Sequence, residues 1–200
     1  MIRNIVFDIG GVLADFEIVR FLSEKGFDGP TVKRLIKASV LSPYWGKFER
    51  AELTEEETLR GFVSMDPELE TELYAAFSNI QGMLTVRPYA VSLVDRLKAA
   101  GLGVYYLSNY SKKAYDECGE SLVFLPAMDG GVVSFRAGMT KPDPGVYRLF
   151  LTEYGLDPGE CLFVDDTEEN VTAAEALGFR GLRFTTYEDL METLGSLGIL

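Results

Sequence analysis

Three carboxylates stand at the ends of two apolar runs of this 200-residue sequence. The run "NIVFD" (4–8) ends in Asp8, and the run "CLFVDD" (161–166) ends in Asp165 and Asp166. Brought to one place, these groups would repel one another unless a cation lay among them. Magnesium prefers such oxygen ligands, and an ionised, unhindered carboxylate can attack phosphorus. The pattern indicates a magnesium site with a carboxylate nucleophile, although each aspartate could instead only cap the turn or helix that follows it.

The polar residues that stand between these carboxylates in the sequence suit a phosphate group. Ser108 and Asn109 end a third apolar run, "LGVYYLSN" (102–109), and Lys141 lies in "GMTKPDPGVY" (138–147), just ahead of an expected helix. An ammonium group neutralises phosphate charge, while a hydroxyl group and free backbone N–H groups of glycines can hold phosphate oxygens. The alternatives are that the Ser–Asn pair only forms a loop and that the lysine is an ordinary solvated charge.

The elements that would carry these residues alternate between strand and helix. The three apolar runs are continuous rather than alternating in polarity, which indicates strands buried on both faces of a parallel sheet. A fourth candidate strand is "GFRGLRF" (178–184), and helical spacing marks 89–101, 144–156 and 167–178. This order predicts an α/β fold with a doubly wound, Rossmann-like parallel sheet. Ligands bind beyond the carboxyl ends of such strands, so the polar residues would converge on one crevice.

The stretch 16–83 breaks this alternation. It consists of helix-like segments such as "TVKRLIKASVL" and "PELETELYAAFSNI" and contains no convincing strand. We therefore predict an all-helical cap at 16–83, inserted into a core made of 1–15 and 84–200. Its two chain connections would suit a hinged lid as well as a rigid insert. The cap residues that could face the crevice are Trp45, Lys47 and Arg50.

The composition excludes several other classes of protein. A formal charge of −12 argues against a nucleic-acid partner, because binding phosphates requires clustered Lys and Arg. The absence of histidine excludes Ser–His and Cys–His catalysis and histidine-bound zinc. The two cysteines, Cys118 and Cys161, form no CxxC pattern, and no apolar stretch approaches the roughly 20 residues of a membrane span. We expect a cytoplasmic monomer or homodimer with neither a nucleic-acid nor a membrane partner.

Four motifs, in this order, resemble those of the haloacid dehalogenase (HAD) superfamily. They are "FDIGGVL", "YYLSN", "TKPDPGVY" and "FVDDTEEN". The resemblance spans the whole chain and is closest to the subgroup with a helical cap after the first motif. That subgroup includes sugar-phosphate phosphatases and the N-terminal phosphatase domain of soluble epoxide hydrolases. The resemblance implies Mg²⁺-dependent hydrolysis of a small phosphorylated metabolite, with a sugar phosphate favoured, through an aspartyl-phosphate.

The resemblance also implies a role for each matching residue. Asp8 would be the nucleophile and a Mg²⁺ ligand, and Lys141 would steady it and the transferring oxygens. The remaining implied roles are phosphate or substrate binding by Ser108, Asn109, Gly11 and Asp15, Mg²⁺ binding by Asp165, Asp166 and the carbonyl of Gly10, and orientation of the acidic pair by Asn170.

The sequence departs from the phosphatase pattern two positions after Asp8. Most phosphatases of the family carry a second aspartate there as general acid and base, and this chain has Gly10. Such proton transfer contributes ~10²–10⁴-fold in rate. Either the enzyme is slow, or its leaving group needs little help, or another group, water before Asp15, replaces the missing acid. Haloacid dehalogenases also lack that aspartate, but they lack the acidic pair of the fourth motif as well. The alternatives are a 2-haloacid dehalogenase-type hydrolase and a catalytically weakened protein that binds phosphorylated ligands.

Overall fold

A five-stranded parallel sheet lies at the centre of the structure, a computed structural model that describes residues 1–200. The strands are β1 (Asn4–Phe7), β2 (Ala14–Phe16), β3 (Leu84–Val86), β4 (Gly103–Ser108), β5 (Gly130–Val133), β6 (Cys161–Asp165) and β7 (Arg180–Arg183). The helices are α1 (Ile18–Glu24), α2 (Gly29–Ala38), α3 (Pro43–Glu49), α4 (Glu55–Met65), α5 (Glu70–Phe77), α6 (Ala90–Ala99), α7 (Lys112–Glu117), α8 (Ser134–Ala137), α9 (Pro144–Tyr154), α10 (Glu168–Glu175) and α11 (Tyr187–Ser196). None of these helices combines the length and the apolar character needed to cross a membrane.

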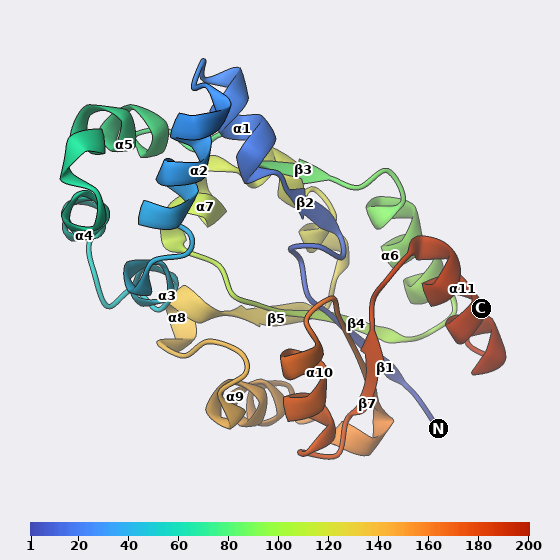
Figure 1. Cartoon of the computed structure of the whole chain (residues 1–200). Coiled ribbons are helices and arrows are strands. Elements are labelled where there is room, and N and C mark those ends of the chain that lie inside the picture. The colour runs from blue at the N-terminus through green and yellow to red at the C-terminus, as the bar shows by residue number, and fades with distance from the viewer.

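The order of the strands makes β1 the centre of the sheet. The order is β5–β4–β1–β6–β7, and every neighbouring pair is parallel (Figure 1). From β1 the chain adds β4 and β5 on one side and then β6 and β7 on the other. The register sets Phe7 beside Tyr106 and Val164, so the carboxyl ends of the three central strands lie at the same edge. Such a reversal of strand order leaves a crevice at that edge, where ligands bind in open α/β sheets.

Alternate residues of the central strand face opposite helical layers. Ile5 and Phe7 belong to a buried cluster with Leu93 of α6 and Leu190 of α11. Val6 belongs to a second cluster, which includes Tyr147 of α9 and Ala174 of α10. Helices therefore cover both faces of the sheet, which confirms the predicted doubly wound α/β fold.

The sequence predicted most of this sheet but missed one strand. The expected strands in 4–8, 102–109, 161–166 and 178–184 are present as β1, β4, β6 and β7, and the three expected helices as α6, α9 and α10. The missed strand is β5, which begins with two glycines and has no long apolar run. A Cβ at Gly131 would lie 2.3 Å from the carbonyl oxygen of Tyr106. Close packing against β4 thus requires a residue that weakens the strand signal.

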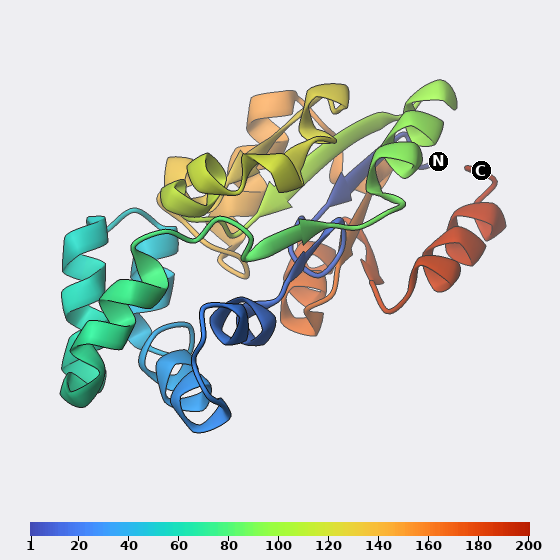
Figure 2. The same cartoon turned by 90° about the horizontal axis from the view of Figure 1, so that it is seen from above.

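The stretch between β2 and β3 is helical, as expected, and lies to one side of the sheet edge (Figure 2). It contains α1 to α5, and its two ends are joined by an antiparallel ribbon that pairs Ala14 with Val86 and Phe16 with Leu84. The sequence did not reveal this ribbon because each strand has only three residues. One hydrophobic cluster continues from Phe62 of α4 to β1. The division into a core (1–15 and 84–200) and a cap (16–83) therefore stays a prediction.

Within these helices, Gly61 of α4 lies against the aromatic ring of Tyr44 in α3. A Cβ at Gly61 would lie 2.4 Å from that ring. We expect Gly61→Ala to lower the free energy of unfolding by about 1–3 kcal/mol through overpacking, although alanine normally stabilises a helix by ~1 kcal/mol relative to glycine. Chemical denaturation measures the effect.

The matched control is Gly46→Ala in α3. A Cβ there would meet only the flexible end of Arg50, at 3.3 Å. We expect this variant to be as stable as the parent chain or slightly more stable. Equal stability of the two alanine variants would show that the α3–α4 contact tolerates the extra carbon.

Candidate active site

The carboxyl ends of the three central strands bring Asp8, Ser108 and Asp165 together. Asp8 directly follows β1, and Ser108 and Asp165 are the last residues of β4 and β6. All three side chains lie at the same edge because their strands are neighbours in register. The segment between α8 and α9 supplies a fourth group, the ammonium of Lys141. The structure therefore brings four of the predicted site residues to one place.

Lys141 lies between two carboxylates. Its Nζ is 2.9 Å from Asp8 Oδ1 and 2.6 Å from Asp165 Oδ2. The side chains of Lys141 and Asp165 are 1% and 0% exposed, so water screens these contacts little. Burial alone would lower the pKa of Lys141, but the charges of the two aspartates outweigh it and raise that pKa. The lysine is therefore held in its charged form beneath the site.

The surroundings of Asp8 disfavour its ionised form. Burial raises the pKa of Asp8 to about 6, and the negative charge of Asp165 adds to this, while Lys141 and a hydrogen bond from Ser108 act in the opposite direction. The backbone N–H of Ile9 also donates to Asp8 Oδ1, at 2.7 Å. A partly buried carboxylate with a raised pKa and a positioned cation is typical of functional sites.

Asn109, which directly follows β4, fixes the backbone of Lys141. The side chain of Asn109 donates from Nδ2 to the carbonyl of Lys141, at 3.0 Å, and its Oδ1 accepts the Lys141 N–H, at 2.8 Å. This pair of bonds holds the lysine backbone against the end of β4. The family resemblance implied phosphate binding by Asn109 and did not reveal this contact of its side chain with Lys141.

The two carboxylates after β6 have different surroundings. Asp165 accepts hydrogen bonds from the backbone N–H of Thr167, at 2.8 Å, and from Asn170 Nδ2, at 3.1 Å to each oxygen. Asp166 is exposed, and only the hydroxyl of Thr167 donates to it, at 3.3 Å. Asn170 therefore orients one member of the acidic pair, Asp165, rather than both.

The acidic residues form a donor set that suits a divalent cation. Carboxylate oxygens of Asp8, Asp165 and Asp166 all lie within 4.8 Å of one another. Gly10 lines the cavity together with Asp8, and no hydrogen-bond donor of the chain reaches its carbonyl oxygen. Hard oxygen donors of this kind fit Mg²⁺.

Gly11 makes room for one of these donors. It has φ +72°, and a Cβ there would lie 2.1 Å from Asp166 Oδ2. Its N–H is already donated to the carbonyl of Ala14, at 2.8 Å. Gly11 thus supplies space for the Asp166 carboxylate, and its backbone donor is not directed at a substrate.

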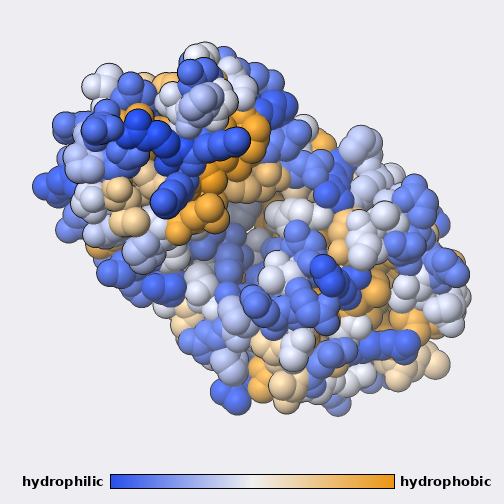
Figure 3. All heavy atoms as spheres, in the orientation of Figure 1, coloured by the Kyte–Doolittle hydropathy of each residue, from blue (hydrophilic) through white to orange (hydrophobic).

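A cavity of about 310 Å³ opens above Asp8. In the view of Figure 3 the surface is hollowed between the lobe that carries α1 to α5 and the rest of the molecule, and hydrophobic side chains border the hollow. The polar part of the lining includes Asp8, Ser108, Asn109, Lys141 and Asn170. The apolar part includes Phe16, Trp45, Met83, Leu84 and Tyr110. The site therefore joins a charged floor to a largely apolar wall.

Not every predicted residue reaches this cavity. Asp15 lies in β2 and pairs with Arg87, whose Nη2 is 2.7 Å away, and it does not line the cavity. Lys47 and Arg50 do not line it either, whereas Trp45 does. The sequence analysis also missed Glu49, one helical turn after Trp45, which lines the cavity. The four-residue spacing that puts both on one face of a helix was the available signal.

Comparison with known proteins gives this fold a family. Residues 2–178 match the haloacid dehalogenase-like hydrolases. The sesquiterpene phosphatase of Aspergillus oryzae is 29% identical over 180 residues, which make up 90% of this chain and 88% of that protein.

Solved structures of similar fold include proteins with different bound groups. A HAD-family enzyme from Bacteroides thetaiotaomicron, in complex with magnesium and inorganic phosphate, matches with a TM-score of 0.70 and 21% identity over 95% of this chain and 99% of its own. The L-2-haloacid dehalogenase of Xanthobacter autotrophicus, with chloropropionic acid covalently bound, matches with a TM-score of 0.67 and 22% identity over 100% of this chain and 85% of its own. At these identities the likeness shows the fold alone. The match over residues 2–178 shows more, and the chain belongs to the haloacid dehalogenase-like hydrolase family.

Proposed function

We propose that this chain is a Mg²⁺-dependent phosphatase that hydrolyses a small phosphomonoester through an aspartyl-phosphate on Asp8. The observation that carries the proposal is the donor set, in which oxygens of three carboxylates lie within 4.8 Å of one another and two of these carboxylates contact Lys141. A carboxylate that attacks carbon needs no such set, so the acidic pair Asp165–Asp166 favours phosphoryl transfer over dehalogenation. The relative from Aspergillus oryzae, a phosphatase by name, supports the same choice.

The proposed metal ligands are Asp8, Asp165, Asp166 and the carbonyl of Gly10. The donor chemistry fits, because Lys141 balances only one of three nearby carboxylates and the Gly10 carbonyl has no other partner. Bound there, Mg²⁺ would neutralise negative charge on the transferring phosphate.

The side chains around the phosphate would divide the work. Asp8 attacks phosphorus, and the P–O bond to the leaving group breaks. Lys141 holds Asp8 in position and offsets charge on the phosphoryl oxygens. Ser108 and the backbone of Asn109 would bind the remaining oxygens, at the end of β4. Water then hydrolyses the aspartyl-phosphate and regenerates Asp8.

The leaving group could be a sugar or a group with apolar surface. The motifs favour a sugar phosphate. The wall formed by Phe16, Trp45, Met83 and Leu84 favours a leaving group with apolar surface, because such a group buries area from water. The named activity of the Aspergillus oryzae relative, on a sesquiterpene, agrees with the second class.

We expect phosphate release that requires both Mg²⁺ and Asp8. The assay compares glucose 6-phosphate, farnesyl monophosphate and p-nitrophenyl phosphate, each with Mg²⁺ and with chelator. Asp8→Asn should reduce turnover at least ~10³-fold, because the nucleophile is lost. The matched control, Asp95→Asn, changes an exposed aspartate of α6 and should retain full activity.

Other results would select the alternatives. Halide release from 2-chloropropionate that ignores chelator would identify a dehalogenase. Binding of phosphorylated ligands without turnover, unaffected by Asp8→Asn, would identify a binding protein. Either result would overturn the phosphatase proposal.

The space at Gly11 gives a test of the metal site. We expect Gly11→Ala to weaken Mg²⁺ binding ~10–100-fold, because the new methyl group displaces the Asp166 carboxylate. Isothermal titration calorimetry with MgCl₂ alone measures this without turnover.

Gly82→Ala is the matched control for that variant. Gly82 also has a positive φ, +84°, but a Cβ there would meet no atom within 4 Å. Both substitutions carry the same backbone strain, ~1–2 kcal/mol, and only the first should change the Mg²⁺ affinity. Unchanged affinity in Gly11→Ala would exclude Asp166 from the metal site.

A further inference from the structure

The cavity lacks a proton donor at the position where related phosphatases carry one. Gly10 lines the cavity, and a Cβ there would meet no atom within 4 Å. Its surroundings therefore have room for a side chain that this sequence does not supply. A side chain that protonates the leaving group would have to come from another element.

Glu49 is the one further carboxyl group of the cavity lining. Among the lining residues only Asp8 and Glu49 carry a carboxyl group. Glu49 is the last residue of α3, so it reaches the cavity from the helices between β2 and β3, whereas Asp8 reaches it from the end of β1. A nucleophile and a second carboxyl group from different elements therefore line the space that a phosphate ester would occupy.

Only one of the two carboxylate oxygens of Glu49 accepts a hydrogen bond from the chain. Trp45 Nε1 donates to its Oε1 at 2.9 Å. The other oxygen, Oε2, takes part in no hydrogen bond with the chain and is not a buried, unsatisfied atom. That oxygen is therefore free to bind a group in the cavity.

The backbone at Glu49 is tied to the sheet. The hydroxyl of Ser134, at the start of α8, donates to the carbonyl of Glu49 at 2.7 Å. Next to it, Arg50 Nη1 is 3.4 Å from Thr140 Oγ1, one residue before Lys141. These contacts link the end of α3 to the segment that supplies the lysine.

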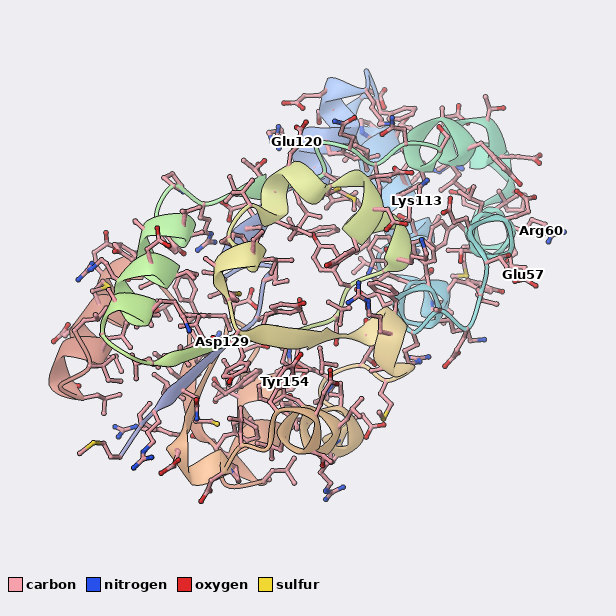
Figure 4. All side chains as sticks on the ribbon, turned by 180° about the vertical axis from the view of Figure 1, so that it is seen from behind. Glu57, Arg60, Lys113, Glu120, Asp129 and Tyr154 are labelled. Atoms are coloured by element: carbon pink, nitrogen blue, oxygen red, sulfur yellow. The ribbon has the colours of Figure 1, made fainter.

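A second set of contacts joins α7 to α4 and to the residue after α5. Lys113 of α7, labelled in Figure 4, lies close to α4. Its Nζ donates to Glu55 Oε2 at 3.0 Å and to the carbonyl of Ser78 at 3.1 Å. Contacts at two separate places thus fix the position from which Glu49 faces the cavity.

We propose that Glu49 is the general acid and base of this site and supplies from α3 the proton transfer that Gly10 cannot. The inference rests on the proposed phosphatase function. When Asp8 attacks phosphorus, the electron pair of the breaking P–O bond goes to the leaving oxygen, which takes the Glu49 proton. Water then attacks the aspartyl-phosphate and gives a proton to the Glu49 carboxylate. The bond between Asp8 and phosphorus breaks, inorganic phosphate leaves, and both side chains return to their starting forms.

The electrostatics of Glu49 suit this role. Burial raises the pKa of Glu49 to about 7, and the negative charge of Asp8 adds to the rise. The hydrogen bond from Trp45 and the positive charges of Lys141 and Arg50 act in the opposite direction. A general acid and base works best when its pKa lies near the working pH. Both protonation states of Glu49 are accessible near neutral pH.

The test is Glu49→Gln, which can still accept the Trp45 hydrogen bond but cannot donate an acidic proton. Glucose 6-phosphate and farnesyl monophosphate have poor leaving groups, whereas p-nitrophenyl phosphate needs little protonation. We expect kcat/KM to fall ~10²–10⁴-fold for the poor leaving groups and less than about 10-fold for the aryl ester. The matched control is Glu70→Gln, an exposed glutamate of α5 with no ion pair, which should change neither value.

The pH profile and a second variant separate catalysis from folding. For a poor leaving group, kcat/KM of the parent chain should fall as the pH rises through about 7, because the acid must be protonated. This limb should be absent in Glu49→Gln. Adding Gly10→Asp to Glu49→Gln should restore at least ~10-fold of the lost rate, since the position is open.

Each outcome decides between the proposals. An equal loss on all three esters, or no rescue by Gly10→Asp, would give Glu49 a purely structural role. Full activity of Glu49→Gln, or a parent chain that hydrolyses only the aryl ester, would overturn the Glu49 proposal and leave the phosphatase intact. No turnover that depends on Mg²⁺ and Asp8 would overturn both.

Discussion

The structure depends on one buried lysine held between two carboxylates. An isolated charge in a protein interior costs several kcal/mol, and only close partners offset that cost. Lys141 has them at 2.9 and 2.6 Å, in Asp8 and Asp165. These partners are adjacent only because β1 and β6 are neighbours in the sheet, and the lysine reaches them because Asn109 holds its backbone. The strand order therefore determines which charged groups meet at this edge of the sheet.

The same cluster remains short of positive charge. Burial raises the pKa of Asp8 to about 6, above the 3.8 of an unperturbed aspartate. A raised pKa means that the ionised form is disfavoured in the folded chain, so this group weakens the fold of the metal-free protein above about pH 6 and not below about pH 4. A divalent cation among Asp8, Asp165 and Asp166 would relieve the excess negative charge. The folded chain thus keeps an unfavourable excess of negative charge at a place where a bound cation can compensate it, as functional sites commonly do.

The sequence revealed the parts of the site whose signal is local. Asp8 and Asp165 follow apolar runs, and the rule for parallel sheets then places them together. The sequence did not reveal contacts between residues far apart in the chain. The side chain of Asn109 donates to the carbonyl of Lys141, which lies 32 residues further on. Asp15 forms an ion pair with Arg87 instead of facing the cavity. The glycines of β5 weakened its strand signal. The spacing of Trp45 and Glu49 placed both on one face of α3, but it did not show that this face meets the cavity.

A proton donor on α3 makes the chemistry depend on a contact that a donor at Gly10 would not need. The backbone of Glu49 is fixed to the sheet layer by Ser134, whereas its side chain is fixed to α3 by Trp45. Displacement of α3 would withdraw the carboxyl group and leave Asp8 with its lysine in place. Attack on phosphorus and protonation of the leaving group would then be controlled by separate parts of the chain. In such an enzyme, the docking of the helices decides which esters are cleaved, because only poor leaving groups need the proton.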